Sequence, residues 1–109
     1  MSATKISTTT QDVWPRRLKE ARLSAALSQR ELGIAAGIDP SVASTRVNRY
    51  ELGVHKADFQ IAVQLAKVLN VPAAFFYAES DEIAAVLIAL HRASATKRRH
   101  FVKLLLEQN

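Results

Sequence analysis

The sequence contains no cysteine, and only three glycines and three prolines occur among its 109 residues. The lack of cysteine excludes a disulfide framework and thiolate sites for metal or redox chemistry. No apolar run approaches the roughly 20 residues that a membrane-spanning helix needs. The Ser/Thr-rich first twelve residues also lack the apolar stretch of a secretory signal. We therefore expect a cytoplasmic protein with no membrane association.

Residues at catalytic or metal-binding spacing are also lacking. The three histidines, His55, His91 and His100, have no carboxylates at the spacing of a metal site. No arrangement of a nucleophile with a base is visible. The sequence therefore predicts a protein that is not an enzyme and that uses no cofactor or metal.

The sequence does contain enough apolar surface for one compact domain, together with an excess of positive charge. Hydrophobic residues make up 49%, and 109 residues are too few for two independent domains. The formal net charge is +5. Basic residues predominate in 14–56 and 92–107, whereas acidic residues predominate in 58–82. A local basic surface suits a polyanion such as nucleic acid, although an ordinary solvated surface has the same signature.

Apolar periodicity and turn residues together predict an all-α fold. No stretch alternates apolar and polar residues as a strand does. Helices are expected over 13–27, 28–37, 39–52, 58–69, 72–76 and 80–92, and from residue 97 onward. We expect a flexible tail over 1–12, a five-helix domain over 13–78 and a C-terminal helical hairpin over 79–109.

Local signals mark several of the expected helix ends. Ser28 and Glu31 have the spacing of a capping box, and Gly37 suits the left-handed turn that ends a helix. Asp39 followed by Pro40 is typical of an N-cap and a first helical position. Pro15 is expected in the first turn of its helix, where proline is tolerated.

The expected helices over 13–27 and 58–69 carry an apolar stripe each. In the second of these, the stripe comprises Phe59, Ala62, Leu65, Ala66 and Leu69. Helical spacing predicts that these five side chains share one buried face.

The expected helix 39–52 has one apolar and one polar face. Ala43, Val47 and Tyr50 follow helical spacing and are expected to face the core. The opposite face offers hydroxyl, amide and guanidinium groups, the types that bond base edges and phosphates. Gly33 lies inside the preceding helix, where the missing side chain would let the two helices pack closely.

Three segments resemble the lambda-repressor-like, Cro-type (XRE) family of helix-turn-helix DNA-binding domains. They are Leu27-Ser-Gln-Arg-Glu-Leu-Gly-Ile-Ala-Ala-Gly-Ile38, Arg49-Tyr-Glu-Leu-Gly53 and Leu65-Ala-Lys-Val-Leu-Asn-Val-Pro72. The resemblance covers about residues 14–77. It implies a five-helix domain whose third helix enters the major groove of double-stranded DNA.

The resemblance also implies roles for particular residues. Gln29 is at a position that contacts a phosphate and supports a base-reading side chain. Arg22 and Glu51 match positions that often form a buried ion pair. The candidate DNA-binding residues are Gln29, Arg30, Ser41, Ser44, Thr45, Arg46, Asn48, Arg49, His55 and Lys56.

This chain departs from the family pattern between Gly37 and Arg49, where it has about four additional residues. Four residues make about one helical turn, so the phase of Val47 and Tyr50 survives the insertion. The additional residues either lengthen the third helix or enlarge the turn before it. His55 and Lys56 either contact a phosphate or belong to an ordinary exposed loop.

The C-terminal segment carries apolar stripes beyond the expected domain. They comprise Ile83, Val86, Leu87, Leu90, Phe101, Leu104 and Leu105. This surplus either completes the core of one chain or forms a homodimer interface, and we favour the interface. The basic run 97–99 either pairs with Glu79, Asp81 and Glu82 or binds an anion, and we favour ion pairing.

These observations predict a transcriptional regulator, in particular a repressor, that binds an inverted-repeat operator as a homodimer. An alternative is an antitoxin of a toxin–antitoxin pair, with the C-terminal hairpin bound to a protein partner. A second alternative is a protein-interaction module without DNA binding.

Overall fold

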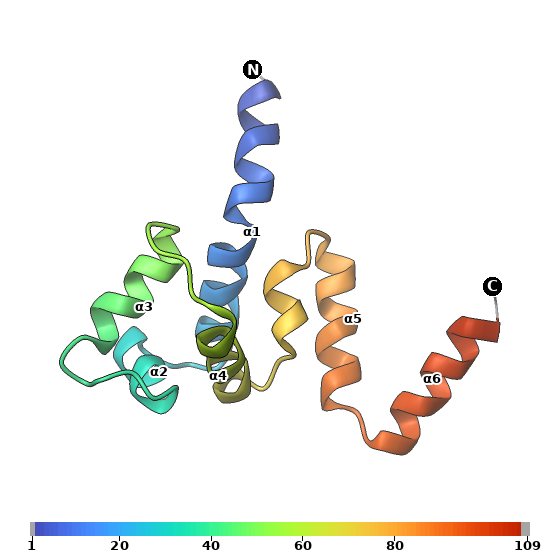
Figure 1. Cartoon of the computed structure of the whole chain (residues 1–109). Coiled ribbons are helices and arrows are strands. Elements are labelled where there is room, and N and C mark those ends of the chain that lie inside the picture. Colours follow the sequence, from blue (N-terminus) through green and yellow to red (C-terminus); the bar gives the residue numbers. More distant parts are fainter. Residues whose placement is uncertain (1, 108–109) are drawn as a thin grey trace.

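The computed structural model describes residues 2–107, with side chains from residue 12 onward. The secondary structure of this part of the chain consists of helices joined by turns, with no strand, which confirms the all-α prediction (Figure 1). The elements are α1 (Ser2–Ser24), α2 (Gln29–Ala35), α3 (Ala43–Leu52), α4 (Phe59–Leu69), the 3-10 helix η1 (Ala73–Tyr77), α5 (Asp81–Arg92) and α6 (Ala95–Glu107). Within residues 2–107, no helix is both long and apolar enough to cross a membrane.

The first five elements enclose a single hydrophobic core. Its five largest fully buried side chains come from five different elements: Leu18, Leu32, Val47, Leu65 and Phe76. Each element therefore buries an apolar stripe in one shared core. We call the part of the chain from residue 13 to residue 78 the helix-turn-helix body.

Helix α1 begins earlier than the sequence analysis predicted. The expected start was Val13, whereas the backbone is helical from Ser2, so Pro15 lies inside the helix rather than in its first turn. Val13, Leu18 and Ala21 are buried and anchor the later turns of α1. Further turns cost less than a new helix, because each added residue contributes a backbone hydrogen bond. Met1 and the side chains before Asp12 lie outside the described part.

The turn between α2 and α3 is enlarged, and α3 is not lengthened. The prediction of an N-cap at Asp39 is wrong, because α3 begins at Ala43 after Val42. The Asp39 carboxylate instead accepts hydrogen bonds from the Ser41 N–H at 2.8 Å and the Ser41 hydroxyl at 2.7 Å. The Val42 N–H donates to the Asp39 carbonyl at 3.0 Å and closes the turn. An Asp side chain favours such a turn as readily as an N-cap.

Helix α4 has the expected bounds, but Phe59 does not share its buried face. Asp58 caps the helix by accepting from the Ile61 N–H at 2.9 Å. Ala62, Leu65 and Leu69 are buried, whereas Phe59 is 75% exposed. The first residue of the helix lies beyond the edge of the core, so the predicted stripe begins one turn too early.

Helices α5 and α6 differ in how they contact the body. Ala84 of α5 is buried, and Leu87 and Ile88 pack against the core. Helix α6 has no buried residue and diverges from α5 in an open V, so the expected hairpin is not a closely packed pair (Figure 1).

The basic run at the start of α6 does not make the ion pairs that we favoured. Arg98 donates to the carbonyls of Leu90 at 2.9 Å and Ala93 at 2.8 Å, near the end of α5. Asp81 lies instead 3.0 Å from Nη2 of Arg17. The last carbonyls of a helix lack partners within the helix and carry partial negative charge, so they compete well for a guanidinium.

Candidate nucleic-acid interface

Helix α2 is fixed at its start by the predicted capping box. The Glu31 N–H donates to Ser28 Oγ at 2.9 Å, and the Ser28 N–H donates to Glu31 Oε1 at 2.8 Å. The bond from the Ser28 backbone and the Ser28 hydroxyl lower the pKa of the Glu31 carboxyl. The cap therefore sets where α2 begins and presents Gln29 and Arg30 at that end.

Gly33 allows α3 to lie directly against α2, as predicted. A Cβ at Gly33 would lie 2.8 Å from the Cβ of Ala43 and 3.0 Å from its carbonyl oxygen. Gly37 follows with a φ of 94°, and the Ile38 N–H donates back to the Gly33 carbonyl at 2.9 Å. This contact and this turn set the angle at which α3 leaves the body.

Helix α3 presents a polar row on the face opposite its buried one. Ala43, Val47 and Tyr50 are buried. Ser44, Thr45, Asn48 and Arg49 are exposed. The row combines hydroxyl, amide and guanidinium groups on one helix, which suits contact with base edges.

Arg46 differs from its neighbours on α3. Its guanidinium donates to the Tyr50 hydroxyl at 3.0 Å and lies 5.8 Å from the centre of the Tyr50 ring. Arg46 is half-buried. The structure therefore turns this predicted contact residue toward the side of α3 and away from the exposed row.

A hydrogen-bonded network connects the polar row to the buried interior. The Gln29 amide donates to Asn48 Oδ1 and to Glu51 Oε1, each at 3.1 Å. Glu51 has only 3% of its side chain exposed and pairs with Arg22 through both carboxylate oxygens, with Arg22 Nη2 3.1 Å from Oε1. Arg22 Nη1 also donates to the Leu27 carbonyl at 2.9 Å. These bonds hold α1, α2 and α3 in one arrangement.

The remaining candidate residues lie around this row. Arg30 is exposed on α2, and Ser41 is exposed in the enlarged turn, where it bonds Asp39. The bonds from the Ser41 hydroxyl and backbone lower the pKa of the Asp39 carboxyl. His55 and Lys56 are exposed in the loop after α3. That loop begins at Gly53, which has a φ of 75°.

Arg17, which was not predicted as a functional or structural site, is the most deeply buried charged residue of the described side chains. It is 2% exposed, donates to the Ala78 carbonyl at 2.8 Å and pairs with Glu20 and Asp81 at 3.0 Å each. Its spacing of four residues from both Val13 and Ala21 places it on the apolar face of α1. A basic residue on an apolar face signals a buried ionic contact, so the spacing could have identified Arg17.

The described residues contain no cluster suited to a metal ion. In residues 2–107, no group of three or more His, Asp or Glu side chains is placed to hold a metal ion. The exposed candidate DNA-binding residues lie on α2, on α3 and in the loops on either side of α3.

Comparisons with known proteins place the chain in a family. The model of the helix-turn-helix family HTH_3 matches residues 18–76, which is more than half of the chain. The crystal structure of the transcriptional regulator BswR is similar, with a TM-score of 0.77 and 33% sequence identity. That similarity covers 85% of this chain and 92% of the BswR chain. No curated protein matches the chain. The resemblance stated above is confirmed, and the chain belongs to the XRE-type helix-turn-helix family of DNA-binding domains.

Proposed function

We propose that this protein is a transcriptional repressor that binds an operator with α3 in the major groove of double-stranded DNA. The observation that carries the proposal is the exposed row of Ser44, Thr45, Asn48 and Arg49 on a helix held by a buried ion pair. The B-DNA major groove admits one α-helix, and hydroxyl, amide and guanidinium groups there distinguish base pairs. The similarity to the regulator BswR supports a role in transcription.

In the proposed complex, side chains around α3 set its register on the DNA. Gln29 and Arg30 lie at the start of α2, and His55 and Lys56 lie in the loop after α3. In this proposal they contact phosphates on either side of the groove, which fixes orientation without reading sequence. A repressor needs no more than this, because occupying an operator excludes other proteins from the same DNA.

The C-terminal helices support binding as a homodimer. Ile83 and Val86 on α5, and Phe101, Leu104 and Leu105 on α6, are exposed apolar side chains. A single reading helix contacts too few base pairs for tight specific binding. A two-fold dimer solves this by reading two half-sites about 34 Å apart, or one helical turn.

Selection of bound sequences from a random DNA pool tests the proposal, and light scattering measures the mass of the free protein. We expect selected sites with inverted symmetry and the mass of a dimer. Leu87 and Leu90 are half-buried, so the interface variant is Ile83→Asp with Leu104→Asp at exposed positions. We expect it to be a folded monomer that binds DNA weakly, with strong salt dependence and little sequence preference.

A matched control carries Ser44→Asp in place of the two apolar changes. It alters the polar row of α3 and leaves the C-terminal helices untouched, so it should lose DNA binding and remain a dimer. A random pool that yields no enriched sequence, from a folded dimer, would contradict the proposed function.

The open position of α6 favours one second candidate, an antitoxin that uses the same DNA-binding body. Helix α6 has no buried residue, and its exposed side chains Phe101 and Leu104 can contact a protein partner as well as a second copy. A chain that is monomeric alone and that recovers operator affinity only with a toxin partner would favour this candidate over the homodimer.

A further inference from the structure

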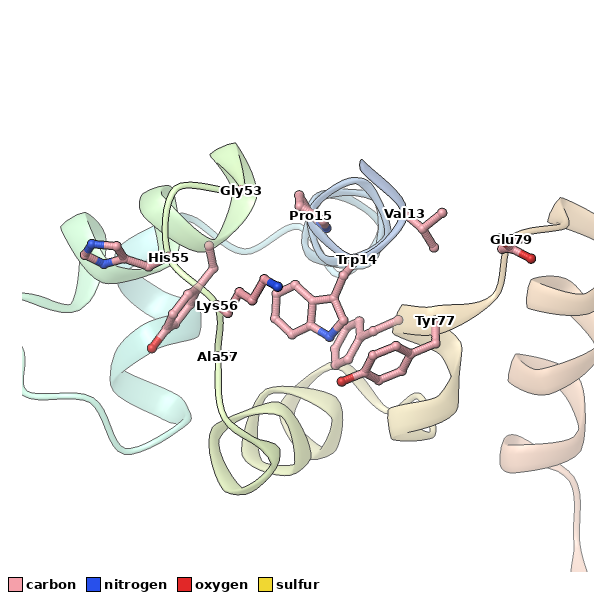
Figure 2. Close-up of a pocket in the computed structure, with 11 residues that line it drawn as sticks. Val13, Trp14, Pro15, Gly53, His55, Lys56, Ala57, Tyr77 and Glu79 are labelled. Carbon is pink, nitrogen blue, oxygen red and sulfur yellow. The ribbon is translucent and has the colours of Figure 1, made fainter. Parts of the chain in front are cut away.

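An open hollow lies between residues 13–15 of α1 and the loop after α3. It has a volume of about 610 Å³ and is formed by α1, the end of α3, the loop 53–57 and the end of η1 (Figure 2). Its size falls within the range of pockets that bind small molecules, about 300–1,000 Å³. The DNA-binding function proposed above makes no use of this space.

Aromatic rings line much of the hollow. Trp14, the only tryptophan of the chain, lies with its ring centre 5.0 Å from Phe76 and 6.3 Å from Tyr50. Tyr77 lines the same space and is 60% exposed. Trp14 is half-buried, so part of a large apolar ring remains uncovered. A flat ring in the ligand would gain both apolar burial and favourable ring geometry there.

The charged groups around the hollow lie at different ends. Lys56 points toward Trp14 in Figure 2, whereas His55 points away from it. Glu79 lies at the opposite end, beyond Tyr77. The part of the hollow beside the Trp14 ring therefore faces a cation, and an anionic group on a flat ligand meets Lys56 rather than Glu79.

We propose that this hollow binds a small aromatic carboxylate, with its ring against Trp14 and its carboxylate on Lys56. A charge-assisted hydrogen bond to an ammonium selects the anion over a neutral isostere. The same site has a consequence for DNA binding, and this part rests on the function proposed above. In the proposed DNA complex, Lys56 contacts a phosphate. A bound carboxylate therefore competes with DNA for the Lys56 ammonium and lowers operator affinity.

The competition must act in both directions. If the carboxylate weakens DNA binding by some factor, then DNA weakens carboxylate binding by the same factor. The hollow would thus act as an inducer site next to the DNA interface, without any large change in the fold.

The test without DNA uses the single Trp14 indole N–H, which gives one resonance in a ¹H–¹⁵N spectrum. The probes are 1-naphthoate and its neutral isostere 1-naphthamide. We expect a saturable shift of the Trp14 resonance with 1-naphthoate. Binding of 1-naphthamide should be about tenfold weaker, the difference expected of a hydrogen bond to a charged group.

Three variants assign the contacts. Lys56→Gln should weaken 1-naphthoate binding about tenfold and remove the preference over the amide. Tyr77→Ala should weaken both probes, and its exposed position leaves the core intact. Lys67→Gln is the matched control, because Lys67 is an exposed lysine of α4 outside the hollow, and it should change neither. No saturable shift, or equal affinity for acid and amide, overturns the proposal.

The test with DNA uses an operator obtained by selection. We expect 1-naphthoate to reduce operator affinity of the wild-type protein and of Lys67→Gln, but not of Lys56→Gln. If the protein binds no DNA, the proposed function fails while the Trp14 titration still reports on the hollow. If 1-naphthoate and operator DNA both bind and neither changes the affinity of the other, the aromatic site stands and its inducer role is overturned.

Discussion

The helix-turn-helix body and the C-terminal helices are built from similar amphipathic segments, yet they cover their apolar faces to very different degrees. In the body, each of five elements contributes a fully buried side chain to one core. Helix α5 buries one face on that core, and α6 buries none of its residues. An amphipathic pattern therefore specifies that a face is apolar, but not whether its own chain covers it.

The two regions also differ in their charged groups. In the body, Arg17, Arg22 and Glu51 are buried and bonded, and the contacts of Glu51 with Arg22 and Gln29 fix the relative positions of α1, α2 and α3. In the C-terminal helices, Arg92 and Arg98 donate to backbone carbonyls at helix ends. Removal of the partner of a charged side chain should thus lower the free energy of unfolding strongly in the body and weakly in the C-terminal helices.

The largest effect is expected for Glu51→Ala. This change leaves the Arg22 guanidinium buried without its carboxylate and removes one acceptor of Gln29. We expect the free energy of unfolding to fall by about 3–5 kcal/mol in urea denaturation. Glu82→Ala is the control, because Glu82 is an exposed acid in the first turn of α5 and should cost under about 1 kcal/mol. A loss as small in Glu51→Ala would mean that the pair is solvated.

Gly33→Ala tests the contact between α2 and α3. The new Cβ would lie 2.8 Å from Ala43 Cβ, so one helix must shift. Overpacking of this kind costs about 1–3 kcal/mol, partly offset by the better helix propensity of alanine, about 1 kcal/mol. We expect a net loss of stability and weaker DNA binding.

A double-mutant cycle separates the contact from propensity. Ala43→Gly removes the opposing methyl group, so the pair Gly33→Ala with Ala43→Gly should be more stable than the sum of the two single changes. Strict additivity would show that α2 and α3 are not in close contact at this position.

Arg49→Ala tests whether the exposed row reads bases. We expect affinity for the selected operator to fall by about 1–3 kcal/mol, with relaxed preference at one base position, if the guanidinium binds a guanine. Binding to random DNA should change much less. Equal losses on operator and random DNA would make Arg49 a phosphate contact. Unfolding should be unaffected, because Arg49 is exposed.

Much of the body could be predicted because its signals are local. The capping box of Ser28 and Glu31, the left-handed Gly37 and the small Gly33 each act through neighbours close in sequence or across one contact. The family motifs add Arg22 and Glu51, which are distant in sequence and meet only in the fold. Local chemistry and one family pattern thus account for the frame that positions α3.

The errors arose where one local pattern is compatible with two structures. Asp39 followed by Pro40 fits both a helix start and a closed turn, and the structure has the turn, with Ala43 close to Gly33. Phe59 has helical spacing with the core but lies at the edge of the buried region. The acidic residues at 79–82 suggested ion pairs with the basic run, yet Arg98 bonds the carbonyls at the end of α5, which are closer in sequence.

The smallest effect is expected for the Ile83→Asp, Leu104→Asp variant when stability is measured in the monomer. Both side chains are exposed, so neither change removes core contacts. A dimer unfolds with a midpoint that rises with protein concentration. The wild-type midpoint should therefore rise with concentration, whereas that of the variant should not. At a concentration low enough for the wild-type protein to be monomeric, the unfolding free energies of the wild type and of the double variant should agree within about 0.5 kcal/mol.

Leu87→Asp is the matched control on α5, because Leu87 packs against the core and a charge there should destabilise the monomer itself. If the double variant loses as much stability as Leu87→Asp at every concentration, the exposed faces of α5 and α6 contribute to the fold of one chain, and the contrast between the two regions fails.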